Sequence, residues 1–329
     1  MRRERRLPVP PHVFITRAIA PAALERIEAA CEVDLWDGEM PPPHSILCDR
    51  VRGVDGILSL ITDRVDSDVY AAAGSTLKVV SNMAVGYNNV DVATAAARGI
   101  AVGNTPGVLT DATADLALAL LLSSARRIVE GVEYIRTGEW RTWHPSLLLG
   151  RDLNGATLGI IGFGRIGQAV ARRAQAFGMQ ILAYSPSLSE GDAQRAGVTC
   201  ADIDTILRES DFVSLHCPLT PETRHLIDAD ALRRMKNDAI LINTARGPVV
   251  DQSALYAALR NGDIGGAALD VTDPEPMADD DPLLLLPNVI VIPHLGSATV
   301  QTREKMALMA ADNLIAGVTG QPLPNAVTL

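Results

Sequence analysis

The sequence lacks the features that mark several special classes of protein. Its 329 residues include only four cysteines, Cys31, Cys48, Cys200 and Cys217, and no CxxC pair. Scattered thiols of this kind are typical of a reducing compartment and argue against a disulfide framework or a zinc site. We therefore expect a cytoplasmic protein with no metal centre.

Long hydrophobic runs and excess positive charge are also missing. The most apolar stretch, residues 116–122, is soon followed by Arg126 and Arg127, whereas a membrane helix needs about 20 apolar residues. The N-terminal stretch MRRERRLPVPP is charged and rich in proline, so we expect a frayed tail rather than a signal peptide. The net charge of −10 at pH 7 argues against a general partner of nucleic acids or acidic membranes.

What the sequence does contain is a glycine turn between a predicted strand and a predicted helix. Residues 158–161 form a short apolar run typical of a buried strand, and residues 168–177 predict a helix. Gly162, Gly164 and Gly167 follow the strand with GxGxxG spacing. The first glycine permits a tight turn, the second lets a pyrophosphate approach the backbone, and the third lets helix and strand pack closely. The motif therefore predicts a dinucleotide site, with phosphates at the helix N-terminus.

The position of this motif, near the middle of the chain, predicts that another domain is built first. Strands and helices alternate over the first hundred residues, which is the pattern of an open parallel sheet. A second series follows the glycine turn, with strands expected at 180–184, 212–216, 239–243, 266–270 and 289–292.

Two helices frame the predicted domains. Residues 110–136 predict one long helix, and the last helix, at residues 299–317, is expected to return to the first domain. We thus expect an α/β protein with two open parallel-sheet domains. A Rossmann cofactor domain, residues 105–294, would be inserted in a discontinuous flavodoxin-like substrate domain, residues 1–104 and 295–329.

Three loops that follow predicted strands carry charged or ionisable side chains. Arg246, Glu275 and His294 each lie just after a strand of the second series, and prolines flank Glu275 and precede His294. Alone, each of these residues would be read as a solvated charge or a structural hydrogen-bonding group. Three at the carboxyl edge of one sheet, where such folds place their ligands, favour a common site.

The sequences of these loops carry a family resemblance. INTARGPVVDQSAL, ALDVTDPEP and IPHLGSAT resemble loops of the D-2-hydroxyacid dehydrogenases, and the resemblance covers nearly the whole chain. VGYNNVD, NTPGVLTDATADLALALLL, GEWRTW and DPLLLLPNVIVIPHLGSAT are similar to segments of glyoxylate/hydroxypyruvate reductases within that superfamily. The resemblance implies reduction of small 2-oxoacids, glyoxylate or hydroxypyruvate, by NAD(P)H.

The resemblance also implies a role for each charged loop residue. Arg246 would hold the substrate carboxylate and polarise the carbonyl, because its planar guanidinium is always charged and binds two oxygens. His294 would donate the proton to the carbonyl oxygen. Glu275 would pair with His294, orient its ring and favour its protonated form.

Further substrate contacts follow from the same resemblance. Val85 and Gly86 would offer backbone N–H groups to the carboxylate, although a turn that needs Gly86 for its geometry is an alternative. Leu60 would line the pocket. Trp143 is similar to a tryptophan that relatives insert into the neighbouring subunit's active site, with an ordinary buried aromatic as the alternative. A homodimer is the family expectation.

The cofactor site departs from an NAD pattern at one position. An NAD site places Asp or Glu at the end of the second strand, and Ser185 stands there. Without that carboxylate a 2′-phosphate is not repelled, which favours NADP(H), with NAD(H) as the alternative. Pro186 and Ser187 follow where NADP-preferring relatives usually place an arginine, so Arg165 is the candidate cation.

Other residues are implied to contact the cofactor. Arg165 and Ile166 would give backbone N–H groups to the pyrophosphate, and Asp270 would meet the nicotinamide carboxamide or simply cap its strand. The remaining implied cofactor residues are Cys217, Pro218, Thr223, Thr244 and Ala245. Two other functions stay open: another D-2-hydroxyacid or phosphite-type dehydrogenase, and a nucleotide-sensing, co-repressor-like binding protein.

Overall fold

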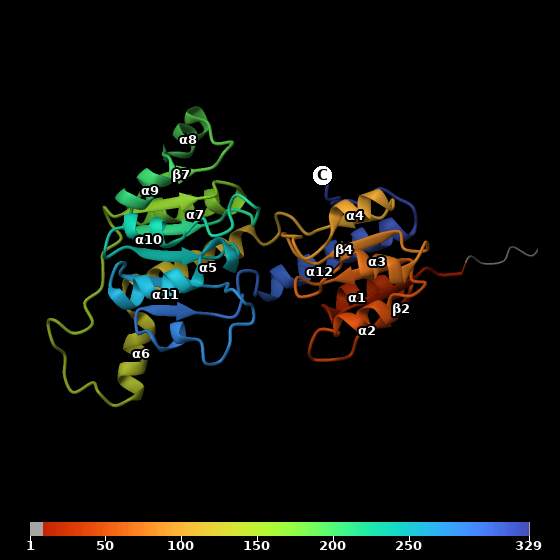
Figure 1. Ribbon diagram of the computed structural model, residues 1–329, viewed down its shortest axis with the longest axis horizontal. Coiled ribbons are helices and arrows are strands. Elements are labelled where there is room, and N and C mark those ends of the chain that lie inside the picture. The colour runs from red at the N-terminus through yellow and green to blue at the C-terminus, as the bar shows by residue number, and fades with distance from the viewer. Residues whose placement is uncertain (1–8, 329) are drawn as a thin grey trace, which may run out of the picture. The chain divides into compact units, whose positions relative to one another are not determined.

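The computed structural model describes residues 9–328, so residues 1–8 of the charged N-terminal stretch lie outside the described residues. The chain divides into two compact units, Met1–Leu109 with Thr299–Leu329 and Thr110–Ala298. In Figure 1 the blue C-terminal helix α12 (Val300–Val318) lies among the red and orange N-terminal elements. The breaks fall after Leu109 and Ala298, whereas we placed them after residues 104 and 294.

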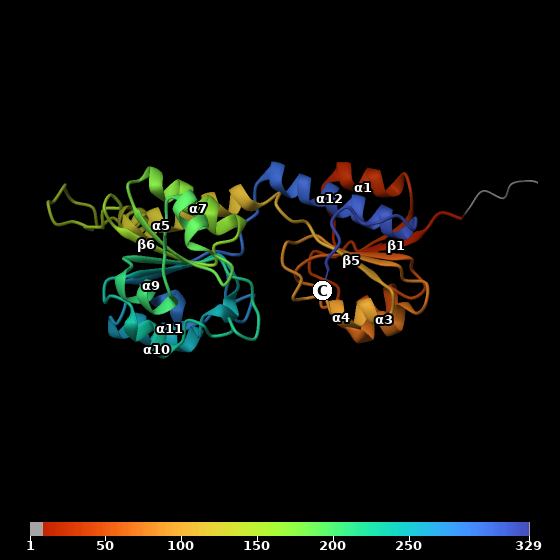
Figure 2. The same cartoon turned by 90° about the horizontal axis from the view of Figure 1, so that it is seen from above.

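The unit that contains both chain ends is built on a five-stranded sheet with the order β2-β1-β3-β4-β5. This is the flavodoxin-type order. Helices α1 and α12 cover one face of the sheet, and α3 and α4 cover the other (Figure 2). The strands are β1 (His12–Ile15), β2 (Glu32–Leu35), β3 (Gly56–Ser59), β4 (Val79–Asn82) and β5 (Ala101–Gly103); the helices before α12 are α1 (Pro21–Glu28), α2 (His44–Arg50), α3 (Ser67–Ala73) and α4 (Val92–Ala97).

The second unit is built on a seven-stranded sheet with the order β12-β11-β10-β9-β6-β7-β8. The strands are β6 (Thr157–Ile161), β7 (Gln180–Tyr184), β8 (Thr199–Cys200), β9 (Phe212–Leu215), β10 (Ile240–Asn243), β11 (Gly266–Leu269) and β12 (Val289–Val291). The helices are α5 (Thr110–Ala125), α6 (Ile128–Arg136), α7 (Arg165–Ala176), α8 (Glu190–Ala196), α9 (Ile203–Glu209), α10 (Ala229–Arg234) and α11 (Gln252–Asn261), with short 3₁₀ turns η1 (Gly247–Val249) and η2 (Pro282–Leu285).

Both sheets are parallel throughout their named strands, which confirms the predicted α/β class. Central strands such as β3, β9 and β10 are buried along their whole length, as expected where helices cover both faces of a sheet. In the second unit the strand order reverses between β6 and β9. The carboxyl ends of these two strands therefore mark the point where such sheets bind ligands.

The single long helix predicted for residues 110–136 is wrong. The structure breaks it into α5 and α6 at Arg127, whose φ is +52°. The carbonyl oxygen of Ala125 accepts a 2.7 Å hydrogen bond from the N–H of Arg151. A β-carbon added to Gly150 would lie 2.3 Å from that same oxygen. The returning chain thus packs against the end of α5, a long-range contact that apolar periodicity cannot reveal.

Two further observations concern membrane spans and metal ligands. Among residues 9–328, no helix combines the length and apolar character that a bilayer crossing requires. In the same residues no group of three or more His, Cys, Asp or Glu side chains is arranged to hold a metal ion. The cytoplasmic location stays a prediction.

Candidate active site

The glycine turn joins β6 to α7, and each of its glycines meets a different surrounding. Gly162 has φ of +101°, and a β-carbon there would lie 2.4 Å from the backbone nitrogen of Cys217. A β-carbon on Gly167 would lie 2.2 Å from the carbonyl oxygen of Gly162, whereas one on Gly164 would meet nothing within 4 Å. The open space beside the second glycine is what a dinucleotide pyrophosphate requires.

Helix α7 begins at Arg165, earlier than the predicted residue 168. Arg165, Ile166 and Gly167 therefore form its first turn, and Gly164 at the N-cap supplies no side-chain cap. The first N–H groups of a helix have no partner within the helix and carry partial positive charge. This turn can therefore receive an anionic diphosphate.

The loop after β9 approaches this glycine turn and is held by hydrogen bonds between its own residues. The Thr223 hydroxyl donates to the Pro218 carbonyl at 2.6 Å and accepts from the N–H of Thr220 at 2.8 Å. Burial raises the pKa of the Cys217 thiol to about 11, so the thiol stays neutral. Thr223 thus shapes the loop, and its predicted contact with the cofactor stays a prediction.

His216 lies in the same loop and is a residue that the sequence analysis overlooked. Its Nε2 is 2.8 Å from the Ser214 hydroxyl, and its Nδ1 is 3.3 Å from the hydroxyl of Thr244 on the next loop. Burial lowers the pKa of His216 to about 4, which keeps the ring neutral. The ring therefore links the two loops that were expected to flank the cofactor.

Arg246 follows β10 in a turn held by the side chain of Asn243. The Asn243 Oδ1 accepts from the N–H of Ala245 at 3.0 Å, and its Nδ2 donates to the Arg246 carbonyl at 2.9 Å. The guanidinium Nη1 donates to the Ala245 carbonyl at 2.7 Å. Burial lowers the pKa of Arg246, and the Glu275 carboxylate opposes this. An arginine remains charged under such conditions, so this edge of the sheet carries a fixed cation.

His294 and Glu275 form a pair on the loops after β12 and β11. The His294 Nδ1 lies 2.5 Å from Glu275 Oε1, and 28% of the His294 side chain is exposed. The His294 backbone has φ of +53°, and its N–H donates to the Asp270 carbonyl at 2.9 Å. Because Nδ1 faces the carboxylate, Nε2 is the ring nitrogen through which a proton can be exchanged with a ligand.

Asp270 fixes the loop that carries His294. Its buried carboxylate accepts hydrogen bonds from the N–H groups of Leu295, at 2.5 Å, and Gly296, at 2.9 Å. Burial raises the pKa of Asp270, and the two N–H donors act against that rise. These contacts are of the capping kind, and a contact with a nicotinamide ring stays a prediction.

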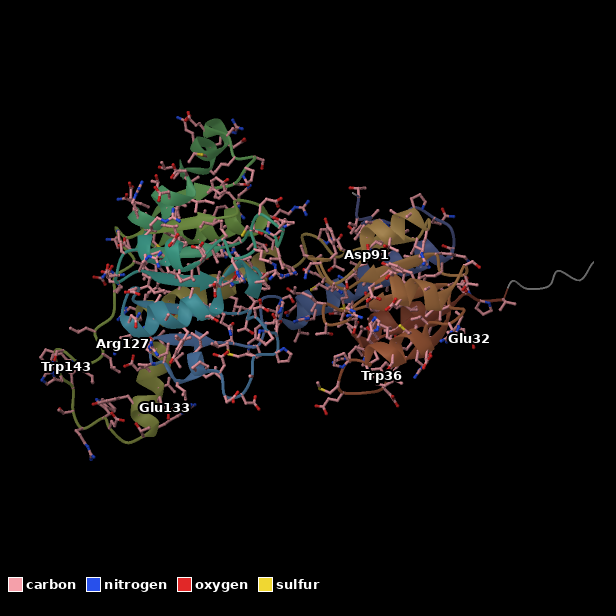
Figure 3. All side chains as sticks on the ribbon, in the orientation of Figure 1. Glu32, Trp36, Asp91, Arg127, Glu133 and Trp143 are labelled. Carbon is pink, nitrogen blue, oxygen red and sulfur yellow. The ribbon has the colours of Figure 1, made fainter. Side chains whose placement is uncertain are left out.

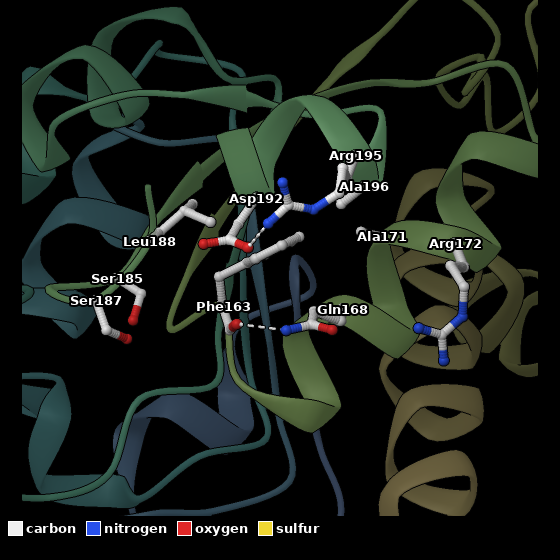
Figure 4. Close-up of a pocket in the computed structure, with 10 residues that line it drawn as sticks. All are labelled: Phe163, Gln168, Ala171, Arg172, Ser185, Ser187, Leu188, Asp192, Arg195 and Ala196. Carbon is white, nitrogen blue, oxygen red and sulfur yellow. Dashed lines mark hydrogen bonds and ion pairs between the residues drawn. The ribbon is translucent and has the colours of Figure 1, made fainter. Parts of the chain in front are cut away.

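Ser185 follows β7 and lines a cavity of about 450 Å³ (Figure 4). The same cavity is lined by Arg172 of α7 and by Arg195 of α8, which is ion-paired with Asp192. Neither arginine was predicted from the sequence. Arg172 lies four residues after Gln168, another lining residue, so their shared helix face becomes evident only once α7 is placed.

The predicted site residues fall into separate groups. Arg246, Glu275, His294 and the cofactor residues all lie in the second unit, whereas Leu60, Val85 and Gly86 lie in the unit with both chain ends. Trp143 belongs to the second unit but extends from the loop after α6, with 77% of the residue exposed (Figure 3). The alternative that Trp143 is an ordinary buried aromatic is therefore wrong for this chain.

A doubly wound sheet with this turn and these strand-edge side chains defines a dinucleotide-dependent oxidoreductase. Residues 118–296 match the family model described as D-isomer specific 2-hydroxyacid dehydrogenase, NAD binding domain. The chain belongs to this family and is an enzyme of 2-oxoacid reduction. The family predicted from the loop sequences is thereby confirmed.

Individual relatives agree with this assignment. A glyoxylate reductase of Korarchaeum cryptofilum is 52% identical over 318 residues, which cover 96% of each chain. A crystal structure of a Thermus thermophilus protein matches with a TM-score of 0.89 and 48% identity, covering 96% of this chain and 100% of that one. An NADPH-dependent glyoxylate/hydroxypyruvate reductase of Sinorhizobium meliloti, in complex with NADP and malonate, matches with a TM-score of 0.85 and 34% identity over 97% of each chain.

Proposed function

We propose that this enzyme reduces glyoxylate and hydroxypyruvate, with NADPH as its preferred reductant. The observation that carries the proposal is the 2.5 Å contact between His294 and Glu275, with Arg246 within electrostatic reach of that carboxylate. Relatives named as glyoxylate reductases support the substrate class.

Each strand-edge side chain has one task in this reaction. The Arg246 guanidinium binds the substrate carboxylate and draws electron density from the adjacent carbonyl. His294 donates a proton from Nε2 to the carbonyl oxygen during reduction and accepts it during oxidation. Glu275 receives the Nδ1 hydrogen bond, fixes the ring and balances the charge of the protonated imidazole. When bound, the nicotinamide cofactor supplies the hydride.

The residues around the glycine turn fit a dinucleotide. Gly164 leaves open space beside the first turn of α7, where N–H groups of Arg165 and Ile166 hold the pyrophosphate. Thr244, Ala245, Cys217 and Pro218, on the loops linked by His216, flank the rest of the cofactor.

The cavity beside Ser185 supports the preference for NADPH. Its lining residues include Arg172 and Arg195 but only one acid, Asp192, which is ion-paired with Arg195. A 2′-phosphate is stabilised in such surroundings. The relative crystallised with NADP is described as NADPH-dependent.

We also propose a homodimer formed through α6. None of its residues is buried, although Ile128, Val132 and Ile135 repeat at helical spacing and are 49%, 42% and 60% exposed. An unpartnered apolar stripe of this kind marks an interaction surface, and Trp143 on the loop after α6 is exposed as well. Sedimentation should show a dimer that Val132→Asp dissociates and Glu133→Lys, on another face of α6, does not; a monomeric wild-type protein would refute this.

The reaction itself is tested by loss of absorbance at 340 nm. NADPH and NADH are each combined with glyoxylate, hydroxypyruvate, pyruvate and oxaloacetate. We expect fastest oxidation with glyoxylate or hydroxypyruvate and a higher kcat/KM for NADPH than for NADH. No turnover with any 2-oxoacid, together with intact nucleotide binding, would favour the nucleotide-sensing alternative.

A further inference from the structure

Three asparagine side chains hold the two loops of the first unit to which the family resemblance assigns substrate contacts. One loop begins with Leu60 after β3, and the other carries Val85 and Gly86 after β4. The two strands are neighbours, with Ser59 opposite Asn82 at their carboxyl ends. Both loops therefore leave the sheet at the same edge.

The peptide units that carry the Val85 and Gly86 N–H groups are each held by their carbonyl oxygens. The Ala84 carbonyl accepts from the N–H of Thr105 at 2.8 Å, and the Val85 carbonyl accepts from Asn104 Nδ2 at 2.8 Å. A trans peptide is planar, so its N–H points opposite to its C=O. Fixing these two oxygens thus fixes the directions of the two N–H groups that follow them.

Asn82 holds the far side of the same turn. Its Nδ2 donates to the Gly86 carbonyl at 3.1 Å, and its Oδ1 accepts from the Ser59 hydroxyl at 3.1 Å. The Asn82 residue is fully buried. A buried amide with partners on both atoms is rigid, because breaking either bond leaves an unsatisfied polar group.

Asn89 joins this turn to the Leu60 loop. Its Nδ2 lies 3.0 Å from the Leu60 carbonyl and 2.9 Å from the Asp63 carbonyl, and its amide pairs reciprocally with that of Asn82 at 3.2 Å. The N–H of Leu60 is held in turn by the Asp63 carboxylate at 2.6 Å. One continuous set of hydrogen bonds therefore spans both loops.

We propose that these three amides are positioning residues, which aim the backbone N–H groups of Val85 and Gly86 at the carboxylate of a 2-oxoacid. Asn104 sets the direction of the Gly86 N–H, and the Asn82–Asn89 pair holds the turn against the neighbouring loop. The inference rests on the proposed function, since it presumes that these N–H groups contact substrate. Beyond the proposed function, it names the side chains that hold the two N–H groups in the orientation that a substrate carboxylate requires.

The test replaces Asn104 by alanine in the full-length enzyme. We expect Asn104→Ala to raise KM for glyoxylate and the inhibition constant of oxalate together, by about tenfold, as loss of one well-placed hydrogen bond does. The kcat should change less than threefold or so, because binding of ground state and transition state weakens alike. The dissociation constant of NADPH should not change, since the cofactor residues lie in the other unit.

Two further variants keep the test decisive. Asn89→Ala removes the link between the loops at a half-buried position and should produce the same joint rise, so it decides the matter if Asn104→Ala does not fold. Asn288→Ala is the matched control, because Asn288 Nδ2 also donates to a backbone carbonyl, that of Gly265 at 3.3 Å, but in the second unit. It should leave KM and the oxalate constant at wild-type values.

The outcomes distinguish the two proposals. Wild-type values of KM and of the oxalate constant in both Asn104→Ala and Asn89→Ala would overturn the positioning role. A parallel loss of NADPH affinity would also overturn it, because that result indicates general disruption. If the wild-type enzyme does not reduce glyoxylate, the proposed function fails instead, and calorimetric titration of oxalate into the same variants still tests the positioning role.

Discussion

Gly167 lies against Gly162 so closely that a β-carbon on Gly167 would come within 2.2 Å of the Gly162 carbonyl oxygen. Gly164, between them, has open space around its α-carbon. The third glycine of the turn therefore serves the packing of α7 on β6, and the second serves the ligand.

This difference predicts opposite effects of one substitution at two positions. Gly167→Ala should lower the free energy of unfolding by about 1–3 kcal/mol, because backbone must move to admit the methyl group. Gly164→Ala should unfold like the wild type but bind NADPH at least about tenfold more weakly, since its methyl group occupies the space for the pyrophosphate. Urea denaturation and fluorescence titration measure the two effects; a stable Gly167→Ala variant would contradict the packing role.

Replacement of His294 should separate proton transfer from cofactor binding. Asparagine accepts the left-handed backbone of His294 better than most residues do, so His294→Asn should fold normally. We expect kcat to fall by about 10²–10⁴-fold with NADPH affinity preserved, because only the proton donor is lost. His144→Asn, at an exposed histidine, is the control and should keep the wild-type kcat. An unchanged kcat in His294→Asn would show that His294 is not the proton donor.

Arg246→Lys should keep the positive charge but lose the planar pair of donors. A lysine ammonium cannot bind two carboxylate oxygens in the same fixed geometry. KM for glyoxylate should therefore rise by about tenfold or more, with a lower kcat, in steady-state assays. Wild-type KM would show that the substrate carboxylate is bound elsewhere.

Ser185→Asp should shift the cofactor preference toward NADH. A carboxylate at this position repels a 2′-phosphate and can accept hydrogen bonds from ribose hydroxyls. The ratio of kcat/KM for NADPH to that for NADH should fall by at least about tenfold. Ser75→Asp adds the same charge at an exposed position of the other unit and should not move the ratio; a shift in both variants would argue for a general charge effect.

His216 should make stability sensitive to mild acid. Its pKa is about 4 in the folded protein, against 6.5 for a free histidine. Between these values the unfolded chain binds more protons, so stability present above pH 6.5 is lost as the pH falls toward 4. The free energy of unfolding should fall by up to about 3 kcal/mol. Urea denaturation at several pH values measures this change. His216→Asn should flatten this dependence and His144→Asn should not.

The features of this fold that depend on residues close together in the chain could be predicted from the sequence. The strand predicted at residues 180–184 coincides with β7, and the glycine turn was identified because its three positions are close in the chain. The start of α7 was placed too late, because a first turn with glycine at position 167 does not resemble a helix.

The contacts that sequence could not supply are those between distant residues. The amides of Asn82 and Asn89 pair and that of Asn104 binds the Val85 carbonyl, and nothing in the spacing of the three residues indicates these contacts. Arg172 and Arg195 share a cavity only because α7 and α8 lie on the same side of β7. The break at Arg127 depends likewise on a chain segment that returns to Ala125 from Gly150.

The contact between Ala125 and Arg151 has a consequence for the segment between them. Residues 126–150 of the second unit begin and end at nearly one point, where the Arg151 N–H donates to the Ala125 carbonyl. An excursion whose ends adjoin can be shortened, lengthened or exchanged with little strain on the sheet behind it. The segment proposed to form the dimer contact is thus a detachable module, which can change while the nucleotide-binding scaffold stays as it is.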